Sequence, residues 1–205
     1  MRTLLWAVLI GGALASQAGA GDLGAAINEL QSGNCEAGLK HLKEIAATGD
    51  AVAEYDLGYT YRHGICVAQN DATAFKWYLA AARHGLSDAQ DQVGWMYANG
   101  IGVKQDLRQS VIWSAASAAQ GNRHARDNLA AACSELGWSH LGGVGGYPQD
   151  FFWSYVWFSL AKENGHTDAE TYLDVTRNGP EGPQIEAQAD KAIRKCIASD
   201  YRDCG

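Results

Sequence analysis

Two stretches of sequence decide the fold: AEYDLGYTYRHGICVAQNDATAFKWYLAAARHG at 53–85 and AQDQVGWMYANGIGVKQDLRQSVIWSAASAAQG at 89–121. A shift of 36 residues superimposes them, and a second shift of the same length carries Ala89 onto Ala125. A fixed period of this length indicates a protein built from structural repeats. The positions that match across the shift are Leu57 and Val93, Gly58 and Gly94, Tyr61 and Tyr97, Gly64 and Gly100, Val67 and Val103, Trp77 and Trp113, and Gly85 and Gly121.

The pattern continues on both sides of these stretches. Gly49 lies one period before Gly85, which indicates a partial repeat upstream. Asp106, Trp113 and Gly121 recur 44 residues later as Asp150, Trp157 and Gly165. We therefore expect an eight-residue insertion in the third repeat, around GWSHLGGVGGYP at 137–148, which is either a recognition loop or a longer connection. The expected divisions are a partial repeat at 22–52, repeats at 53–88, 89–124 and 125–168, and a C-terminal cap at 169–205.

The apolar spacing inside each period is helical. Ala53, Leu57 and Tyr61 recur every four residues and form one helical stripe, and a second stripe containing Trp77 and Tyr78 follows a glycine turn. One such hairpin is too small to bury its own core, so neighbouring hairpins must stack. The prediction is an all-α, right-handed α/α superhelix, or solenoid, of antiparallel helical hairpins. Expected helices are 22–32, 36–48, 51–63, 70–84, 87–99, 106–120, 123–137, 150–164, 167–177 and 183–199.

Three further expectations follow from the same positions. Asp71 or Asp106 is placed to cap the start of a second helix. Glycines such as Gly85 stand where a left-handed residue would end one. The tryptophans that recur once per repeat, Trp77, Trp113 and Trp157, are expected in the core.

The first twenty residues predict export. Arg2 precedes the apolar run LLWAVLIGGALA, and Ala18, Gly19 and Ala20 are suited to signal peptidase. The alternative is a membrane anchor, but the run is nearer a dozen residues than the ~20 that span a bilayer. We expect cleavage after residue 20, a periplasmic or secreted product, and no stable membrane insertion afterwards.

Composition narrows the range of partners. The chain is 47% hydrophobic and 19% charged, which favours one folded unit over disorder. The formal net charge of −7 leaves no cationic surplus to neutralise a phosphate backbone, so nucleic acid is not an expected partner.

The two quoted stretches resemble Sel-1-like repeats, relatives of the tetratricopeptide repeat, in their pattern A, LG, Y, GxGV, D, A, WY, AA and G. The resemblance is strongest for 53–124 and weaker for 125–168, where Cys133 stands in place of the tyrosine. It implies an α-solenoid adaptor that binds a protein or peptide on its concave face. Taken with the predicted export, we expect a non-catalytic interaction module without a cofactor, whose partner is a protein segment or a cell-envelope component.

The residues of that face follow from helical geometry and the related fold. On the first helix of a repeat, Tyr55, Tyr59 and Arg62 fall away from Leu57. The next repeat offers Asp91, Trp95 and Asn99. In the tetratricopeptide fold the position after the LG pair faces the groove, and here Tyr59 and Trp95 occupy it. Aromatic and arginine side chains dominate binding hot spots, although these residues could instead pack on the preceding repeat.

The five cysteines acquire a context from export, because an oxidising compartment permits disulfides. The spacing of Cys196 and Cys204 resembles that in cysteine-rich secreted members of the family, which implies a bridge. Cys35 and Cys66 lie in adjacent loops and form the second expected pair. Four cysteines allow three pairings, which sequence alone does not separate. Cys133 is expected to be a buried free thiol.

Catalytic patterns are sparse. Ser159 and Lys162 spell S-x-x-K, the nucleophile and base spacing of penicillin-interactive serine enzymes, without the K-T-G or S-D-N elements. They define the alternative function, an exported enzyme acting on a β-lactam or peptidoglycan. The six histidines show no metal-binding spacing, and GGVGG at 142–146 follows no strand, so no metal or phosphate site is expected.

Overall fold

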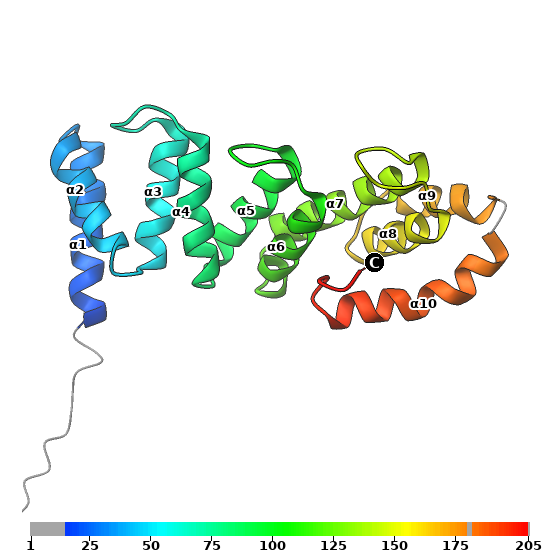
Figure 1. The fold of residues 1–205 in the computed structure, drawn as a ribbon. Helices are drawn as coiled ribbons and strands as arrows, with labels where there is room; N and C mark the ends of the chain where they lie inside the picture. The colour runs from blue at the N-terminus through cyan, green and yellow to red at the C-terminus, as the bar shows by residue number, and fades with distance from the viewer. Residues whose placement is uncertain (1–14, 180–181, 205) are drawn as a thin grey trace, which may run out of the picture.

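The computed structural model describes residues 15–179 and 182–204, and every regular element in these ranges is a helix (Figure 1). The predicted all-α fold is therefore confirmed. Residues 1–14 of the expected signal peptide lie outside the described ranges, and the first helix begins at Ala15. The helices are α1 (Ala15–Gln31), α2 (Cys35–Ala46), α3 (Ala51–His63), α4 (Asp71–Arg83), α5 (Ser87–Asn99), α6 (Leu107–Ala119), α7 (Arg123–Gly142), α8 (Phe151–Glu163), α9 (Ala169–Arg177) and α10 (Gly182–Ala198).

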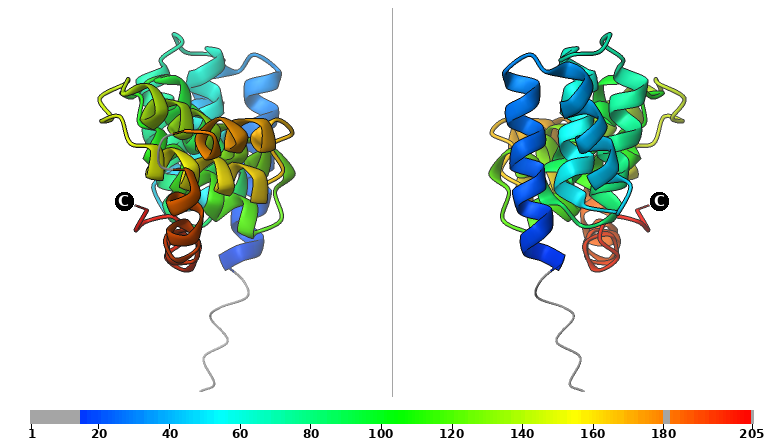
Figure 2. Two further views of the ribbon diagram at one scale, coloured as in Figure 1. Left: turned by 90° about the vertical axis from the view of Figure 1, so that its right-hand side faces the viewer. Right: turned by 90° about the vertical axis from the view of Figure 1, so that its left-hand side faces the viewer.

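The helices form antiparallel hairpins that follow one another along an elongated stack, from α1 at one end to α10 at the other (Figures 1 and 2). Three apolar clusters run along the stack. One joins α1, α2 and α3, the second centres on α4 and α5, and the third extends from α6 to α10. Each cluster draws on more than one hairpin, so the stacking supplies the core that a single hairpin lacks. The predicted solenoid is confirmed.

The same loop closes each of the three complete hairpins. Its first glycine, Gly64, Gly100 or Gly143, has a φ between 63° and 67°, a left-handed conformation that glycine adopts without steric cost. The backbone N–H that precedes each second helix donates to the carbonyl of Tyr61, Tyr97 or His140, at 2.8, 3.0 and 2.8 Å. This shared hydrogen bond makes His140 the counterpart of the two tyrosines.

Helix caps and stops largely follow the expectation. Asp106 accepts the N–H of Gln109 at the start of α6, but Asn70 rather than Asp71 caps α4, because Asp71 is already the first helical residue. Gly85 follows the end of α4 with a φ of 88°, as the expected stop requires.

The glycine of the LG pair marks the point where the two helices of a hairpin approach most closely. A Cβ on Gly58 would come 2.6 Å from the ring of Tyr78, on Gly94 2.4 Å from the Ser114 hydroxyl, and on Gly137 2.5 Å from the ring of Phe158. Small residues at this position therefore let the backbones meet.

The repeated tryptophans do not all lie in the core, contrary to expectation. Trp157 is only 1% exposed, whereas Trp77 and Trp113 are half-buried at the edges of the apolar clusters. The residue directly after each tryptophan, Tyr78, Ser114 or Phe158, is the one that meets the glycine of the LG pair. That neighbouring position is buried in all three repeats.

The additional residues of the third repeat are mainly helical and do not form a long loop. α7 has 20 residues where α5 has 13, so it ends five residues later than expected. The LG pair of this repeat is Leu136 and Gly137, and Cys133 is not the counterpart of Tyr61. We expected the insertion around 137–148, but the additional residues lie in the first part of α7, ahead of the Leu136–Gly137 pair. Apart from this helix end and the start of α1, all helix boundaries lie within two residues of those expected.

Both expected disulfides are present. Cys35–Cys66 joins the start of α2 to the loop after α3, with the Cα atoms 5.2 Å apart, and Cys196–Cys204 closes the segment after α10, with the Cα atoms 4.7 Å apart. Cys133 is a buried free thiol, and burial raises its pKa far above the ordinary value. None of the described helices is long and apolar enough to cross a bilayer.

Candidate functional site

Six predicted binding residues lie on α3 and α5, the first helices of two consecutive repeats. Leu57 and Val93, on the opposite side of these helices, are fully buried. The six are half-buried or exposed, as their spacing requires. We call this surface the first-helix face; it comprises Tyr55, Tyr59, Arg62, Asp91, Trp95 and Asn99.

Arg62 and Trp95 connect the two repeats. The guanidinium carbon of Arg62 lies 4.5 Å from the centre of the Trp95 ring, so a cation from α3 covers an aromatic ring from α5. The Nη1 atom of Arg62 is buried and has no hydrogen-bond partner among the described residues. Such a pair contributes ~0.5–1 kcal/mol in an exposed setting and presents a combined aromatic and cationic surface.

Tyr59 is the most exposed aromatic of the face. Its side chain is 46% exposed, and its ring lies 4.2 Å from the imidazole of His63, one turn later. Tyr55 differs, because its ring packs 5.2 Å from the buried ring of Tyr78. Burial, together with the negative charges of Asp88 and Asp56, raises the pKa of Tyr55. Tyr55 thus packs within its own repeat, while Tyr59 is open to a partner.

The two polar members of the face are engaged within the protein. Asp91 accepts a hydrogen bond of 2.7 Å from Asn128 of α7. Burial raises the pKa of Asp91, and the Asn128 bond and the charge of His124 oppose that rise. Asn99 donates to the carbonyl of Trp95, one turn earlier on the same helix. Asp91 therefore joins α5 to α7. The Asn99 side chain satisfies a backbone carbonyl in the last turn of α5.

Sequence reasoning missed Trp138. It follows the true LG pair of the third repeat, and so is the counterpart of Tyr59 and Trp95, and it is 42% exposed. Its ring lies 5.3 Å from Phe158 and 5.0 Å from Tyr172 of α9. The dipeptide LG followed by an aromatic residue was the available signal, but the alignment at a period of 36 placed Ala131 at this position.

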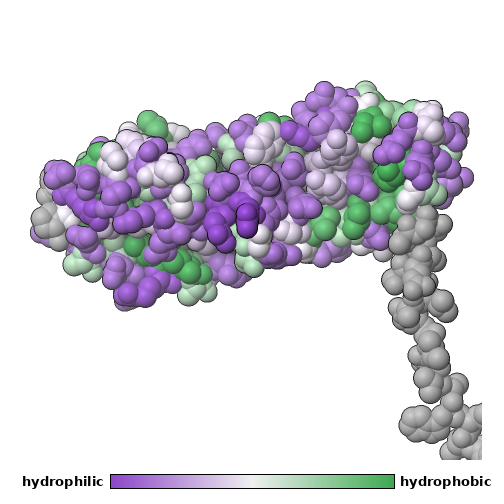
Figure 3. All heavy atoms as spheres, turned by 180° about the vertical axis from the view of Figure 1, so that it is seen from behind, coloured by the Kyte–Doolittle hydropathy of each residue, from purple (hydrophilic) through white to green (hydrophobic). Residues whose placement is uncertain are grey.

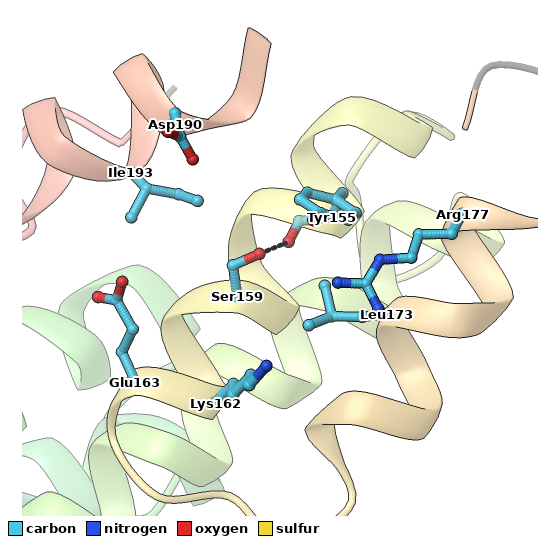
Figure 4. A pocket seen from close by; sticks show the side chains of 8 residues that line it. All are labelled: Tyr155, Ser159, Lys162, Glu163, Leu173, Arg177, Asp190 and Ile193. Carbon is cyan, nitrogen blue, oxygen red and sulfur yellow. Dashed lines mark hydrogen bonds between the residues drawn. The ribbon is translucent and has the colours of Figure 1, made fainter. Parts of the chain in front are cut away.

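Ser159 and Lys162 line a cleft of about 350 Å³ between α8, α9 and α10 (Figure 4). The Ser159 hydroxyl donates to the carbonyl of Tyr155 at 2.9 Å, which is a bond within its own helix. Lys162 forms an ion pair with Glu170, and Arg177 reaches the same carboxylate at 2.8 Å. No hydrogen bond between Ser159 and Lys162 occurs in the described structure, so the pair lacks the contact that would activate a nucleophile.

Among the described residues there is no cluster of three or more His, Cys, Asp or Glu side chains that could hold a metal ion. The first-helix face consists instead of three aromatic rings, one arginine, one hydrogen-bonded carboxylate and one hydrogen-bonded amide. Surfaces of this composition suit the non-covalent binding of another chain.

Two solved structures are similar to this chain. The chain is similar to a Sel1 repeat protein from Oxalobacter formigenes, with 22% identity, a TM-score of 0.46 and coverage of 86% of this chain and 76% of that one. It is also similar to c5321, a protective antigen present in uropathogenic Escherichia coli strains displaying an SLR fold, with 28% identity, a TM-score of 0.48 and coverage of 93% and 39%. This chain therefore spans well under half the length of c5321. No match was found among curated proteins.

The family model of the Sel1 repeat matches residues 51–86, 87–122 and 130–166. Its third match begins seven residues into α7, in agreement with the position of the Leu136–Gly137 pair. Proteins built from these repeats generally mediate protein–protein interaction and are typically non-catalytic. Because the matches together cover more than half of its residues, the chain belongs to the Sel1 repeat family.

Proposed function

We propose that this protein is a non-catalytic, exported adaptor that holds an extended segment of a partner protein against the first-helix face. The observation that carries the proposal is the position after the LG pair, which presents Tyr59, Trp95 and Trp138 on three consecutive first helices. Side chains repeated at a constant position suit a ligand that runs along the stack. Aromatic residues give such a ligand large contact areas at low conformational cost.

Export is supported by the two disulfides, which form in oxidising compartments, and by the signal-like composition of residues 1–20. A cell-envelope or secreted partner fits this location. Expression in a Gram-negative host followed by intact mass measurement tests it. We expect a mature chain that begins at Gly21 and gains mass at four cysteines only after reduction and alkylation; an uncleaved, fully reduced product would contradict export.

The binding proposal is tested with a phage-displayed library of random 12-residue peptides. Peptides selected on the mature protein are synthesised, and their affinities are measured by fluorescence polarisation. We expect the Tyr59→Ala/Trp95→Ala variant to bind them at least tenfold more weakly. The matched control is Val144→Ala/Ile197→Ala, which removes two exposed aliphatic side chains outside the face and should leave affinity unchanged. Equal loss in both variants, or enrichment of no peptide, would refute the proposal.

The enzyme alternative centred on Ser159 and Lys162 gains no specific support from the geometry described above. A fluorescent penicillin provides a direct check. We expect no covalent label on the wild type, and a label that is lost only in Ser159→Ala would reinstate the enzyme.

A further inference from the structure

An apolar pocket opens beside Tyr59, between the first helix of the partial repeat and the first helix of the next. Its volume is about 240 Å³, and its lining includes Ile27 and Leu30 of α1, Asp56, Tyr59 and Thr60 of α3, and Ile65 of the following loop. The hydroxyl of Thr60 donates to the Asp56 carbonyl at 2.7 Å, so it is already occupied. Hydrophobic residues gather at the end of the molecule that carries α1, and a second group lies toward the opposite end of the same face (Figure 3).

The size of the pocket suits one side chain and excludes a large ligand. Pockets for drug-sized molecules occupy roughly 300–1,000 Å³, which exceeds the space available here. The pocket borders the exposed ring of Tyr59, which belongs to the first-helix face. A chain lying on that face can therefore place one of its side chains in the pocket without leaving the surface.

Asp56 gives the pocket a charge. Asp56 is a half-buried residue, and no described residue donates a hydrogen bond to its carboxylate or forms an ion pair with it. Burial raises the pKa of Asp56, and the negative charge of Asp50 adds to the rise. No Lys or Arg lines the pocket. A ligand that covers this carboxylate removes it from water, and a cation in the ligand would offset that cost.

We propose that this pocket anchors the partner by an aliphatic side chain that adjoins an ammonium group, with the side chain between Ile27, Leu30 and Ile65 and the ammonium at Asp56. The inference rests on the proposed function and adds the chemistry of the partner to it. Tyr59 supplies a ring against which the same cation can lie. Charge complementarity selects this occupant, because a neutral or acidic segment that covers Asp56 would remove its carboxylate from water without pairing it.

Two small probes separate the contributions. L-leucinamide carries an isobutyl side chain and an ammonium group, and N-acetyl-L-leucinamide carries the same side chain without the charge. Titration into the ¹⁵N-labelled mature protein at pH 7 should produce saturable shifts at the amides of Ile27, Thr60 and Ile65 with leucinamide, and at least fivefold weaker binding with the acetylated probe. Asp56→Asn should make the two affinities equal. Asp127→Asn, which neutralises an exposed carboxylate on α7, is the matched control and should change neither.

Each alternative result overturns a defined part of the inference. Equal affinities for the two probes in the wild type, or an unchanged preference in Asp56→Asn, would remove the role of the charge. Saturable shifts that avoid these three amides would remove the pocket. Selected peptides that require Trp95 but are indifferent to Asp56→Asn would leave the proposed adaptor intact and refute this anchor, so the two proposals fail separately.

Discussion

The second and third repeats close their loops in the same way but differ in the length of their first helix. α5 has 13 residues and α7 has 20, yet the loop-closing bonds at Tyr97 and His140 and the glycines at 100 and 143 are equivalent. Seven residues make nearly two helical turns, so the addition lengthens the helix without rotating its buried face. A solenoid can therefore extend one helix while keeping its stacking surface.

The packing of the two repeats also differs. The α5–α6 hairpin meets through Gly94 and Ser114, and the hydroxyls of Ser110 and Ser114 are buried without hydrogen-bond partners among the described residues. The α7–α8 hairpin meets through Gly137 and Phe158, inside a cluster that extends to the cap. The third repeat is thus packed by aromatic rings and the second by small side chains, which predicts that the stack is more stable at its C-terminal part.

The largest effect is expected from the disulfides at the two ends of the stack. Cys35–Cys66 spans 31 residues and Cys196–Cys204 spans 8, and the loop-entropy relation gives stabilisations of about 3.7 and about 2.5 kcal/mol. Urea unfolding of the double serine variants measures both. The Cys35→Ser/Cys66→Ser variant should lose more, because this bridge closes the longer loop and lies at the end of the stack farthest from the aromatic cluster. A larger loss at the C-terminal bridge would break the predicted gradient.

The next largest effect concerns the glycine contact of the third repeat. In Gly137→Ala a new Cβ would lie 2.5 Å from Phe158, and overpacking of this kind costs roughly 1–3 kcal/mol. Gly24→Ala is the control, since a Cβ at this helical position meets nothing within 4 Å, and it should stabilise the protein by up to about 1 kcal/mol. Thermal unfolding followed by circular dichroism compares them. Equal stability of the two variants would show that α7 and α8 can move apart without loss of stability.

The sequence predicts the fold well because the repeat encodes each step locally. The predicted bounds of the helices in the first two repeats agree with the observed bounds to within one residue. These predictions used the glycines at 64 and 100 and the alternation of apolar stripes. The register of the third repeat was not predictable from stripes alone. Leu129 and Leu136 are separated by seven residues and are both buried, so either satisfies the pattern. The contact between Gly137 and Phe158 and the loop-closing hydrogen bond at His140 distinguish them.

The candidate site was predictable in part for a related reason. Helical spacing placed Tyr59 and Trp95 outside the core, as observed. It did not reveal that Arg62 covers Trp95 or that Asp91 binds Asn128, because these contacts depend on how consecutive repeats are stacked. The pocket beside Asp56 depends on the same distances between helices, whereas Trp138 was missed because the third repeat was aligned in the wrong register.

A smaller and uniform effect is expected from the caps of the second helices. Asn70, Asp106 and Asp150 each accept the N–H three residues later, at 2.9–3.0 Å. Replacement of any one by Ala should cost ~1 kcal/mol, because a helix N–H loses its partner. Asp71→Asn, directly after the first cap, should change stability by less than about 0.5 kcal/mol. Chemical unfolding of the four variants measures these losses. A cap whose replacement by Ala left the unfolding free energy unchanged would contradict the equivalence of the three loops.

The smallest effect is a pH dependence confined to the third repeat. His140 is 3% exposed where the other repeats have tyrosine, and burial, with a further contribution from Arg108, lowers its pKa below the ordinary 6.5. The folded state then binds fewer protons than the unfolded state, so this contribution to stability is complete above pH 6.5 and is lost as the pH falls below it. His140→Gln should remove this loss, whereas His63→Gln, at an exposed position, should retain it. The unfolding free energy of the wild type minus that of His140→Gln is measured at pH 7.5 and at pH 5, so that the contribution of other titrating groups cancels. A difference that is the same at both pH values would contradict the prediction and place the imidazole in contact with water.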